Sequence, residues 1–134
     1  MLNRLNDALD FQGQALALRS QRQRLIASNI ANADTPGFVA RDFDFAQALR
    51  EATGSLPGVQ GLVRSSVGHI GSSAAAGGQP TLTYATPSQT NLDRNTVDMD
   101  RERAAFADNS VKYEATLRFI NSHVRTMLEA IKGQ

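Results

Sequence analysis

The sequence contains no cysteine and no tryptophan. The absence of cysteine excludes disulfides and thiolate metal sites, and it fits an exported protein as well as a cytosolic one. A basic excess is missing too, because 14 Lys and Arg against 13 acidic residues leave a net charge of +1. That balance argues against a nucleic-acid or membrane footprint, which needs a clear basic surplus or basic face. At 134 residues, the chain is expected to form one domain.

Long apolar runs are also missing, since no stretch approaches the roughly 18 apolar residues of a membrane span. The N-terminal segment MLNRLNDALD carries charges at Arg4, Asp7 and Asp10. It lacks the apolar run of a secretory signal. We therefore expect a soluble chain, or one exported by a route that uses no cleaved signal peptide.

Candidate catalytic and metal-binding residues are scarce as well. His69 and His123 are the only histidines, and neither has a metal-ligand pattern of Cys, Asp or Glu around it. Asp42 and Asp44 could form a metal or acid/base pair, but no His or third ligand stands nearby. We interpret these aspartates as part of a solvated face or a helix cap. The sequence therefore predicts no catalytic site, no metal site and no cofactor.

A serine and a cluster of arginines are the remaining candidates for a catalytic or binding site. Ser28 lies outside any nucleophile-elbow sequence. Arg19, Arg22 and Arg24 form a small basic cluster, but no aromatic residues interleave with it. We therefore expect neither a small-molecule substrate nor a nucleic-acid partner.

Residues 2–33 have the periodicity of one amphipathic helix with two apolar rows. The first row contains Leu2, Leu5, Leu9, Leu16, Ile26 and Ile30, and the second contains Phe11, Ala15, Leu18 and Leu25. Leu9 and Phe11 lie about 200° apart around the axis, so the helix is apolar on more than one side. A single partner helix buries one row, so we expect the second to face water and to mark a contact with other chains. Gly13 is expected to destabilise this helix by about 1 kcal/mol relative to Ala at the same position.

Residues 98–132 show the clearest pattern, a heptad-like seam that is loose at its start and tight at its end. The seam contains Met99, Phe106, Tyr113, Leu117, Ile120, Val124, Met127 and Ile131. Asn95, Thr96 and Asp98 are candidate N-caps, and Gly133 closes the helix. Neither Pro nor Gly interrupts this segment.

Residues 53–90 hold seven of the ten glycines and three of the four prolines, which is typical of a linker or loop. Short strand-like pieces lie at Leu62-Val63 and at Thr81–Ala85. We expect a mainly α fold in which two long terminal helices form an antiparallel, coiled-coil-like pair. A Gly/Pro/Ser-rich central loop is expected to hold a short helix and minor β structure. The expected units are 1–52, 53–90 and 91–134, with 1–34 and 91–134 forming one helical domain.

The N-terminal helix must stop near Ala33 or Asp34, because Pro36 disfavours helical geometry at the residue before it. Pro-Gly is also the natural central pair of a type II turn. Asn29 and Asn32 share a face in the last turn. They are placed to bond the exposed carbonyls or a neighbouring backbone, either within one chain or between chains.

The segment ARDFDF follows this break and alternates acidic and aromatic residues, as an extended segment with one apolar face does. Asp44 with Gln47 resembles a capping box. This pattern predicts a short helix over Phe45–Ala52 that ends before Gly54.

The stretch ASNIANADTPGF resembles the N-terminal signature of bacterial flagellar basal-body rod and hook proteins. Nine residues carry the match: Ala27, Asn29, Ile30, Ala31, Asn32, Thr35, Pro36, Gly37 and Phe38. Two further segments, ARDFDF and NTVDMDRE, resemble the proximal rod subunits of that family, and their anchors are Asp42, Phe43, Phe45, Val97 and Met99. The V-x-E-E-M-like entry of other rod subunits is absent. The resemblance covers residues 1–50 and 91–134.

This resemblance implies a structural subunit of the periplasmic rod, exported by the flagellar type III apparatus without cleavage. The subunit would polymerise through its terminal helices and transmit torque from the membrane ring to the hook. Implied partners are other copies of the chain, other rod subunits, the rod adaptor protein FliE and the MS-ring protein. The expected helix-packing residues are Leu9, Leu16, Tyr113, Leu117, Ile120, Val124, Met127 and Ile131. The alternatives are a stand-alone cytosolic coiled-coil module and, less favoured, a small enzyme.

Overall fold

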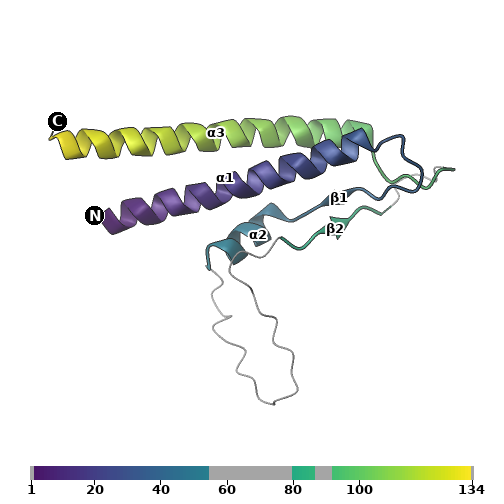
Figure 1. Cartoon of the computed structure of the whole chain (residues 1–134), viewed down its shortest axis with the longest axis horizontal. Helices are drawn as coiled ribbons and strands as arrows, with labels where there is room; N and C mark the ends of the chain where they lie inside the picture. The colour runs from purple at the N-terminus through teal and green to yellow at the C-terminus, as the bar shows by residue number, and fades with distance from the viewer. Residues whose placement is uncertain (1, 55–79, 87–91, 134) are drawn as a thin grey trace, which may run out of the picture.

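The computed structural model describes residues 2–54, 80–86 and 92–133. Its elements are α1 (Leu2–Ala31), β1 (Arg41–Asp42), α2 (Phe45–Ala52), β2 (Thr83–Tyr84) and α3 (Met99–Lys132). α1 and α3 lie side by side and run in opposite directions, and α2 packs on the other side of α1 (Figure 1). The predicted fold class is therefore confirmed: the chain is mainly helical, with two long terminal helices, one short helix and a minor sheet.

The chain turns sharply after α1, close to the predicted break. α1 ends at Ala31, two residues before the predicted boundary at Ala33. Gly37 has a φ of +73°, and the backbone N–H of Phe38 donates to the carbonyl of Thr35 at 3.3 Å. Both observations fit a type II turn with Pro36 and Gly37 at its centre.

The short elements begin and end where local signals place them. α2 spans the predicted residues, and the Asp44 side chain accepts a hydrogen bond from the backbone N–H of Gln47 at 3.1 Å. Among the three candidate caps of α3, Asp98 is the N-cap, and Gly133 closes the helix in the left-handed conformation. The register of the sheet pairs Arg41 with Tyr84. The predicted piece at Leu62-Val63 lies outside the described residues.

The second apolar row of α1 is covered by the chain itself, which corrects our expectation that it faces water. Leu18 is buried together with Phe43 and Ala48 in the apolar core. Four partly buried side chains pack around them: Leu25, Phe45, Leu49 and Leu82. The expectation was wrong because β1 and α2 run back along α1 after the turn. Of this row, only Phe11 is exposed.

α3 meets α1 through a polar line of residues, with its large apolar side chains beside that line. Within α3, Asn109 and Thr116 are buried. Of the predicted heptad seam, Met99, Tyr113, Ile120 and Met127 are half-buried, whereas Phe106, Leu117, Val124 and Ile131 are exposed. Leu9 and Leu16 on α1 are half-buried. Positions 117 and 124 lie about 60–80° around the axis from Asn109, which explains their exposure.

None of the helices in the described parts of the chain is long and apolar enough to cross a membrane.

Two glycines allow the backbone account to be tested with the same substitution. Neither Gly13 nor Gly37 has an atom within 4 Å of an added Cβ, so steric contact plays no part. Gly37→Ala should lower the free energy of unfolding by about 1 kcal/mol, because Ala disfavours positive φ. Gly13→Ala should raise it by about 0.5–1 kcal/mol, because Gly weakens a helix interior. Urea unfolding, monitored by circular dichroism, measures both changes. If both substitutions changed stability in the same direction, the assignment of Gly37 to a turn and Gly13 to a helix interior would be contradicted.

Candidate functional site

The turn that follows α1 is held by the side chain of Asn95, which comes from the segment before α3. Its Nδ2 donates to the carbonyls of Asn32, Ala33 and Thr35 at 2.9, 2.8 and 2.8 Å. These three carbonyls belong to the turn that follows Ala31, the last residue of α1. Asn95 donates to them while it is only 3% exposed. It therefore ties the turn after α1 to the segment before α3.

Asn29 joins the last turn of α1 to β1. Its Nδ2 donates to the Arg41 carbonyl at 2.8 Å, and its Oδ1 accepts from the Arg41 backbone N–H at 3.0 Å. The amide thus pairs with the backbone as a neighbouring strand would, and Asn29 is only 1% exposed. Because both polar atoms of a buried amide are satisfied here, this contact fixes the path of the chain after the turn.

Asn32 makes local contacts instead. Its Nδ2 donates to the Ser28 carbonyl at 2.8 Å, and its Oδ1 accepts from the Thr35 hydroxyl at 3.1 Å. The two asparagines that sequence analysis grouped together therefore have different tasks. Asn29 reaches a distant segment, whereas Asn32 shapes the turn.

Backbone and side-chain bonds join the segment after the turn to the segment before α3. The Gly37 N–H donates to the Asp93 carbonyl at 2.7 Å, and the Thr96 N–H donates to the Phe38 carbonyl at 3.0 Å. The Ala40 N–H donates to the Thr96 hydroxyl at 2.9 Å. Residues far apart in the sequence thus form one corner, which we call the helix corner and define as residues 29–42 with 93–102.

An ion pair between Arg22 on α1 and Asp42 on β1 also holds the helix corner against α1. Arg22 Nε and Nη2 donate to Asp42 Oδ1 and Oδ2 at 3.1 and 3.0 Å, a two-pronged geometry that favours Arg over Lys. The hydrogen bond from Arg22 to Asp42 raises the pKa of Arg22. Our interpretation of Asp42 as part of a solvated face or cap was wrong, because α1 brings Arg22 against it. Asp44 does act as a cap.

Glu102 adds a second carboxylate to the helix corner. Asn29 Nδ2 donates to Glu102 Oε2 at 3.3 Å. Burial raises the pKa of Glu102, and the nearby charge of Asp42 raises it further, while the hydrogen bond from Asn29 opposes both. The carboxylate of Glu102 is therefore less favourable in the folded chain than in water.

Beyond the corner, polar contacts continue along the line where α1 meets α3. Asn109 Nδ2 donates to the Arg19 carbonyl at 2.9 Å and to Gln23 Oε1 at 2.6 Å. Arg19 Nε donates to the Thr116 hydroxyl at 3.2 Å, and its guanidinium lies 4.2 Å from the centre of the Phe45 ring. Burial lowers the pKa of Arg19. A buried polar layer of this kind fixes the register of paired helices.

The other predicted motif residues surround this corner with varied exposure. Thr35 and Pro36 are exposed, and Ile30, Phe38, Val97 and Met99 are half-buried. His123 is half-buried on α3, and His69 lies outside the described residues. Among the described residues, no group of three His, Cys, Asp or Glu side chains is placed to hold a metal ion.

Comparison with known proteins shows the family to which the chain is similar. Residues 9–38, which run from α1 through the turn, match the family described as "Flagella basal body rod protein". The chain is 48% identical to the flagellar basal body rod protein FlgB of Salmonella typhimurium over 99% of both chains. It is 49% identical to FlgB of Proteus mirabilis over 98% of both, and 46% identical to FlgB of Aeromonas hydrophila over 90% of this chain and 89% of that one.

The chain belongs to the FlgB family of flagellar basal body rod proteins. It is a structural subunit of the rod in the flagellar basal body, and not an enzyme. The family match covers α1 and the turn, where the side chains of Asn29 and Asn32 bond backbone atoms of the same chain. In a structural subunit, such contacts set the shape of the molecule.

Sequence reasoning missed several residues on which the helix corner depends. Asn95 was identified only as a candidate helix cap, although it lies in the segment NTVDMDRE that carries part of the family resemblance. Arg22 was assigned to a small basic cluster, and nothing in its sequence context pointed to Asp42. Asn109 carried no signal, because it falls between the apolar positions of the heptad pattern.

Removing the Asn95 amide tests whether it holds the turn after α1. Asn95→Ala should lower the free energy of unfolding by about 2 kcal/mol, because the buried hydrogen bonds from Asn95 to the carbonyls of this turn are lost. The matched control is Asn121→Ala on the exposed side of α3, which should change stability by less than about 0.5 kcal/mol. Urea unfolding measures both, and equal effects of the two substitutions would contradict the assigned role.

The pH dependence of stability tests the environment of Glu102. A carboxyl whose pKa is raised by folding favours the folded state when protonated, and this contribution is lost as pH rises through the folded pKa. Glu102→Gln should therefore raise the free energy of unfolding at pH 7. The gain should shrink as pH falls through the raised pKa of the folded chain toward the ordinary Glu value of about 4.3. Chemical unfolding across this range measures the difference, and a gain that grows toward low pH would refute it.

Proposed function

We propose that this chain polymerises within the rod through its terminal helices, and that the resulting array transmits torque from the membrane ring toward the hook. The observation that supports this is an apolar stripe along one side of α3 that no described part of the chain covers. The stripe contains Phe106 (40% exposed), Leu117 (37%), Val124 (42%), Leu128 (51%) and Ile131 (74%).

Outside this stripe, α3 exposes ion pairs together with the apolar side chains of Val111 and Phe119. Three ion pairs join residues one turn apart on α3: Asp108 with Lys112, Glu114 with Arg118, and Arg125 with Glu129. Charged side chains of this kind suit a hydrated surface, whereas a continuous apolar stripe usually marks a contact with a partner. α3 therefore presents one side suited to packing against other helices.

A tube built by such contacts needs a surface on one copy to meet a different surface on the next, since only this type of contact continues into a helical array. Many packed contacts along parallel helices would also resist twisting about the tube axis. We propose other copies of the chain and other rod subunits as neighbours. FliE and the MS-ring protein, the periplasmic location and export without cleavage rest on the family resemblance.

Charge placed in the stripe should block assembly without unfolding the subunit. Leu117→Asp and Val124→Asp should keep the circular dichroism spectrum of the purified chain, because both positions are already exposed. In cells whose own copy is deleted, either variant should abolish or severely reduce basal bodies that carry hooks, and swimming with them. Ser122→Asp, on another exposed side of the same helix, should restore both.

Electron microscopy of isolated basal bodies and swimming assays provide the measurement. Normal hooks and swimming with Leu117→Asp and Val124→Asp would show that the stripe is not an assembly surface.

A further inference from the structure

We propose that a groove between α1 and α2 receives the C-terminal end of α3 from a second copy of the chain. This inference rests on the polymerisation proposed above and adds where the end of one subunit would dock on the next.

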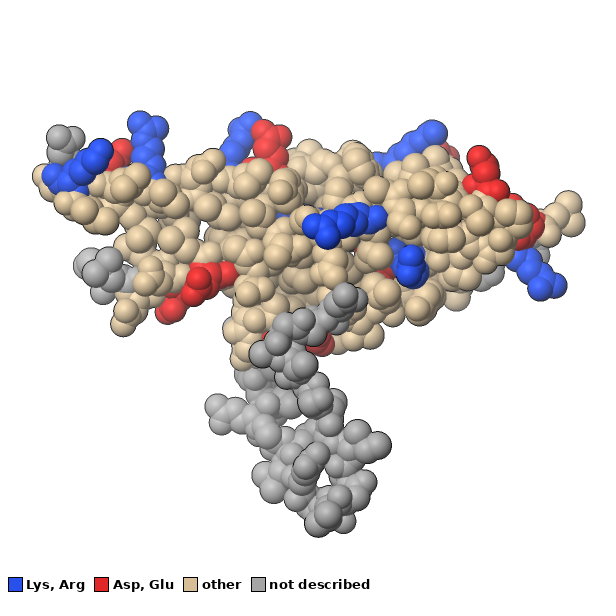
Figure 2. Space-filling model, in the orientation of Figure 1, with Lys and Arg blue, Asp and Glu red and all other residues tan. Residues whose placement is uncertain are grey.

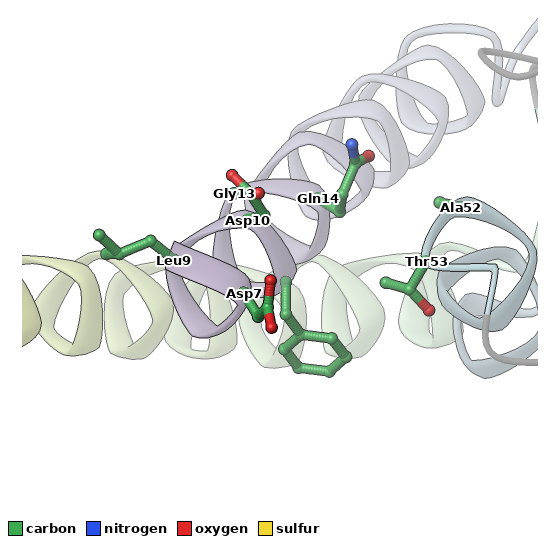
Figure 3. Close-up of a pocket in the computed structure, with 8 residues that line it drawn as sticks. Asp7, Leu9, Asp10, Gly13, Gln14, Ala52 and Thr53 are labelled. Carbon is green, nitrogen blue, oxygen red and sulfur yellow. The ribbon is translucent and has the colours of Figure 1, made fainter. Parts of the chain in front are cut away.

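The groove has a volume of about 590 Å³ and is open at the surface. Six of its lining residues come from the first half of α1, and the other two come from the end of α2: Asp7, Leu9, Asp10, Phe11, Gly13, Gln14, Ala52 and Thr53. Figure 3 shows Ala52 and Thr53 to one side of the α1 residues, while Leu9 points in the opposite direction. The space is large enough for more than one side chain of a partner.

The chemistry of the groove favours a cation beside an apolar group. Asp7 and Asp10 are exposed, and among the described residues no basic side chain forms an ion pair with either. The carboxyl end of α2 also lies here, and the negative end of its helix dipole adds partial negative charge. Phe11 contributes an aromatic side chain that is 44% exposed.

The last turns of α3 carry the complementary groups. Leu128 and Ile131 are 51% and 74% exposed. Lys132 lies beside them, and in the described part of the chain no carboxylate forms an ion pair with it. Arg125, by contrast, is paired with Glu129 on its own helix. One end of α3 thus offers two large apolar side chains next to a cation, as the groove requires.

Within one molecule, the described part of α3 does not contact the α2 side of the groove. α1 lies between α2 and α3, and the described parts of α2 and α3 make no contact (Figure 1). In Figure 2, basic side chains project from the α3 edge near its C-terminal end with acidic ones among them, and only acidic ones show on the α1 edge below. Different surfaces on the two partners make this a head-to-tail contact, which can repeat along a filament.

Charge reversal on both sides provides the first test, in cells whose own copy is deleted. Asp10→Lys and Lys132→Glu should each reduce the number of hook-bearing basal bodies several-fold, because each places like charges together at the contact. The double variant Asp10→Lys/Lys132→Glu should restore much of the loss, since the pair is recreated with opposite orientation. If the double variant is no better than the worse single variant, the proposed pairing is wrong.

Disulfide trapping provides a second test, because the chain has no cysteine of its own. Ala52→Cys with Ile131→Cys in one chain should give a ladder of dimers, trimers and longer oligomers when assembled basal bodies are treated with a mild oxidant. Mixing chains that carry one substitution each should give dimers only. Ala46→Cys with Ile131→Cys is the control, since position 46 is exposed on α2 but does not line the groove.

The outcomes separate this inference from the proposed function. If no ladder forms while Leu117→Asp still blocks assembly, the groove contact is wrong and polymerisation through the stripe stands. If the thiol of the Ala52→Cys variant is already shielded from alkylation in the free monomer, the chain's own residues fill the groove, and the inference is overturned. Normal assembly of the stripe variants would instead count against the proposed function itself.

Discussion

The shape of this subunit depends on one side chain, the buried amide of Asn29. Its two polar atoms pair with the backbone N–H and carbonyl of Arg41, so the chain leaving α1 is held in place as if it were paired with a strand. A buried amide that lost either partner would leave an unsatisfied polar group, which costs about 1–3 kcal/mol. This constraint directs β1 along α1, and everything that follows β1 depends on that path.

As a consequence, α1 is covered on two sides by the described parts of the chain, whereas they cover α3 on only one. α1 is covered on one side by α3 and on another by α2 and the Phe43 region, so it works as the centre of the subunit. α3 uses a polar line that contains Asn109 and Thr116 to meet α1, and it leaves the apolar stripe from Phe106 to Ile131 exposed on one side. Hydrogen bonds in the polar line specify the contact between α1 and α3, and the stripe remains available for assembly. A polar contact within the subunit and an apolar surface on its outside suit a protein that must keep a defined shape as a monomer and make many contacts in an assembly.

Local signals in the sequence were enough for much of this fold. The Pro36-Gly37 turn, the Asp44 cap of α2 and the long uninterrupted α3 follow from the short-range chemistry of caps and turns. What failed was the assignment of partners to apolar rows. Periodicity shows that the row containing Leu18 must be covered, but it cannot show that the chain's own α2 covers it. The pairing of Arg22 with Asp42 was equally invisible, because it exists only after the turn has folded back.

The central claim is that side chains, above all Asn29, hold the segment after the turn as firmly as a helix holds its own backbone. Native-state hydrogen exchange of the Arg41 amide tests this most directly, since that N–H is bonded to the Asn29 side chain. The account predicts that it exchanges with the same free energy of opening as amides in the middle of α1. Rapid exchange at Arg41 while the interior of α1 stays protected would contradict it.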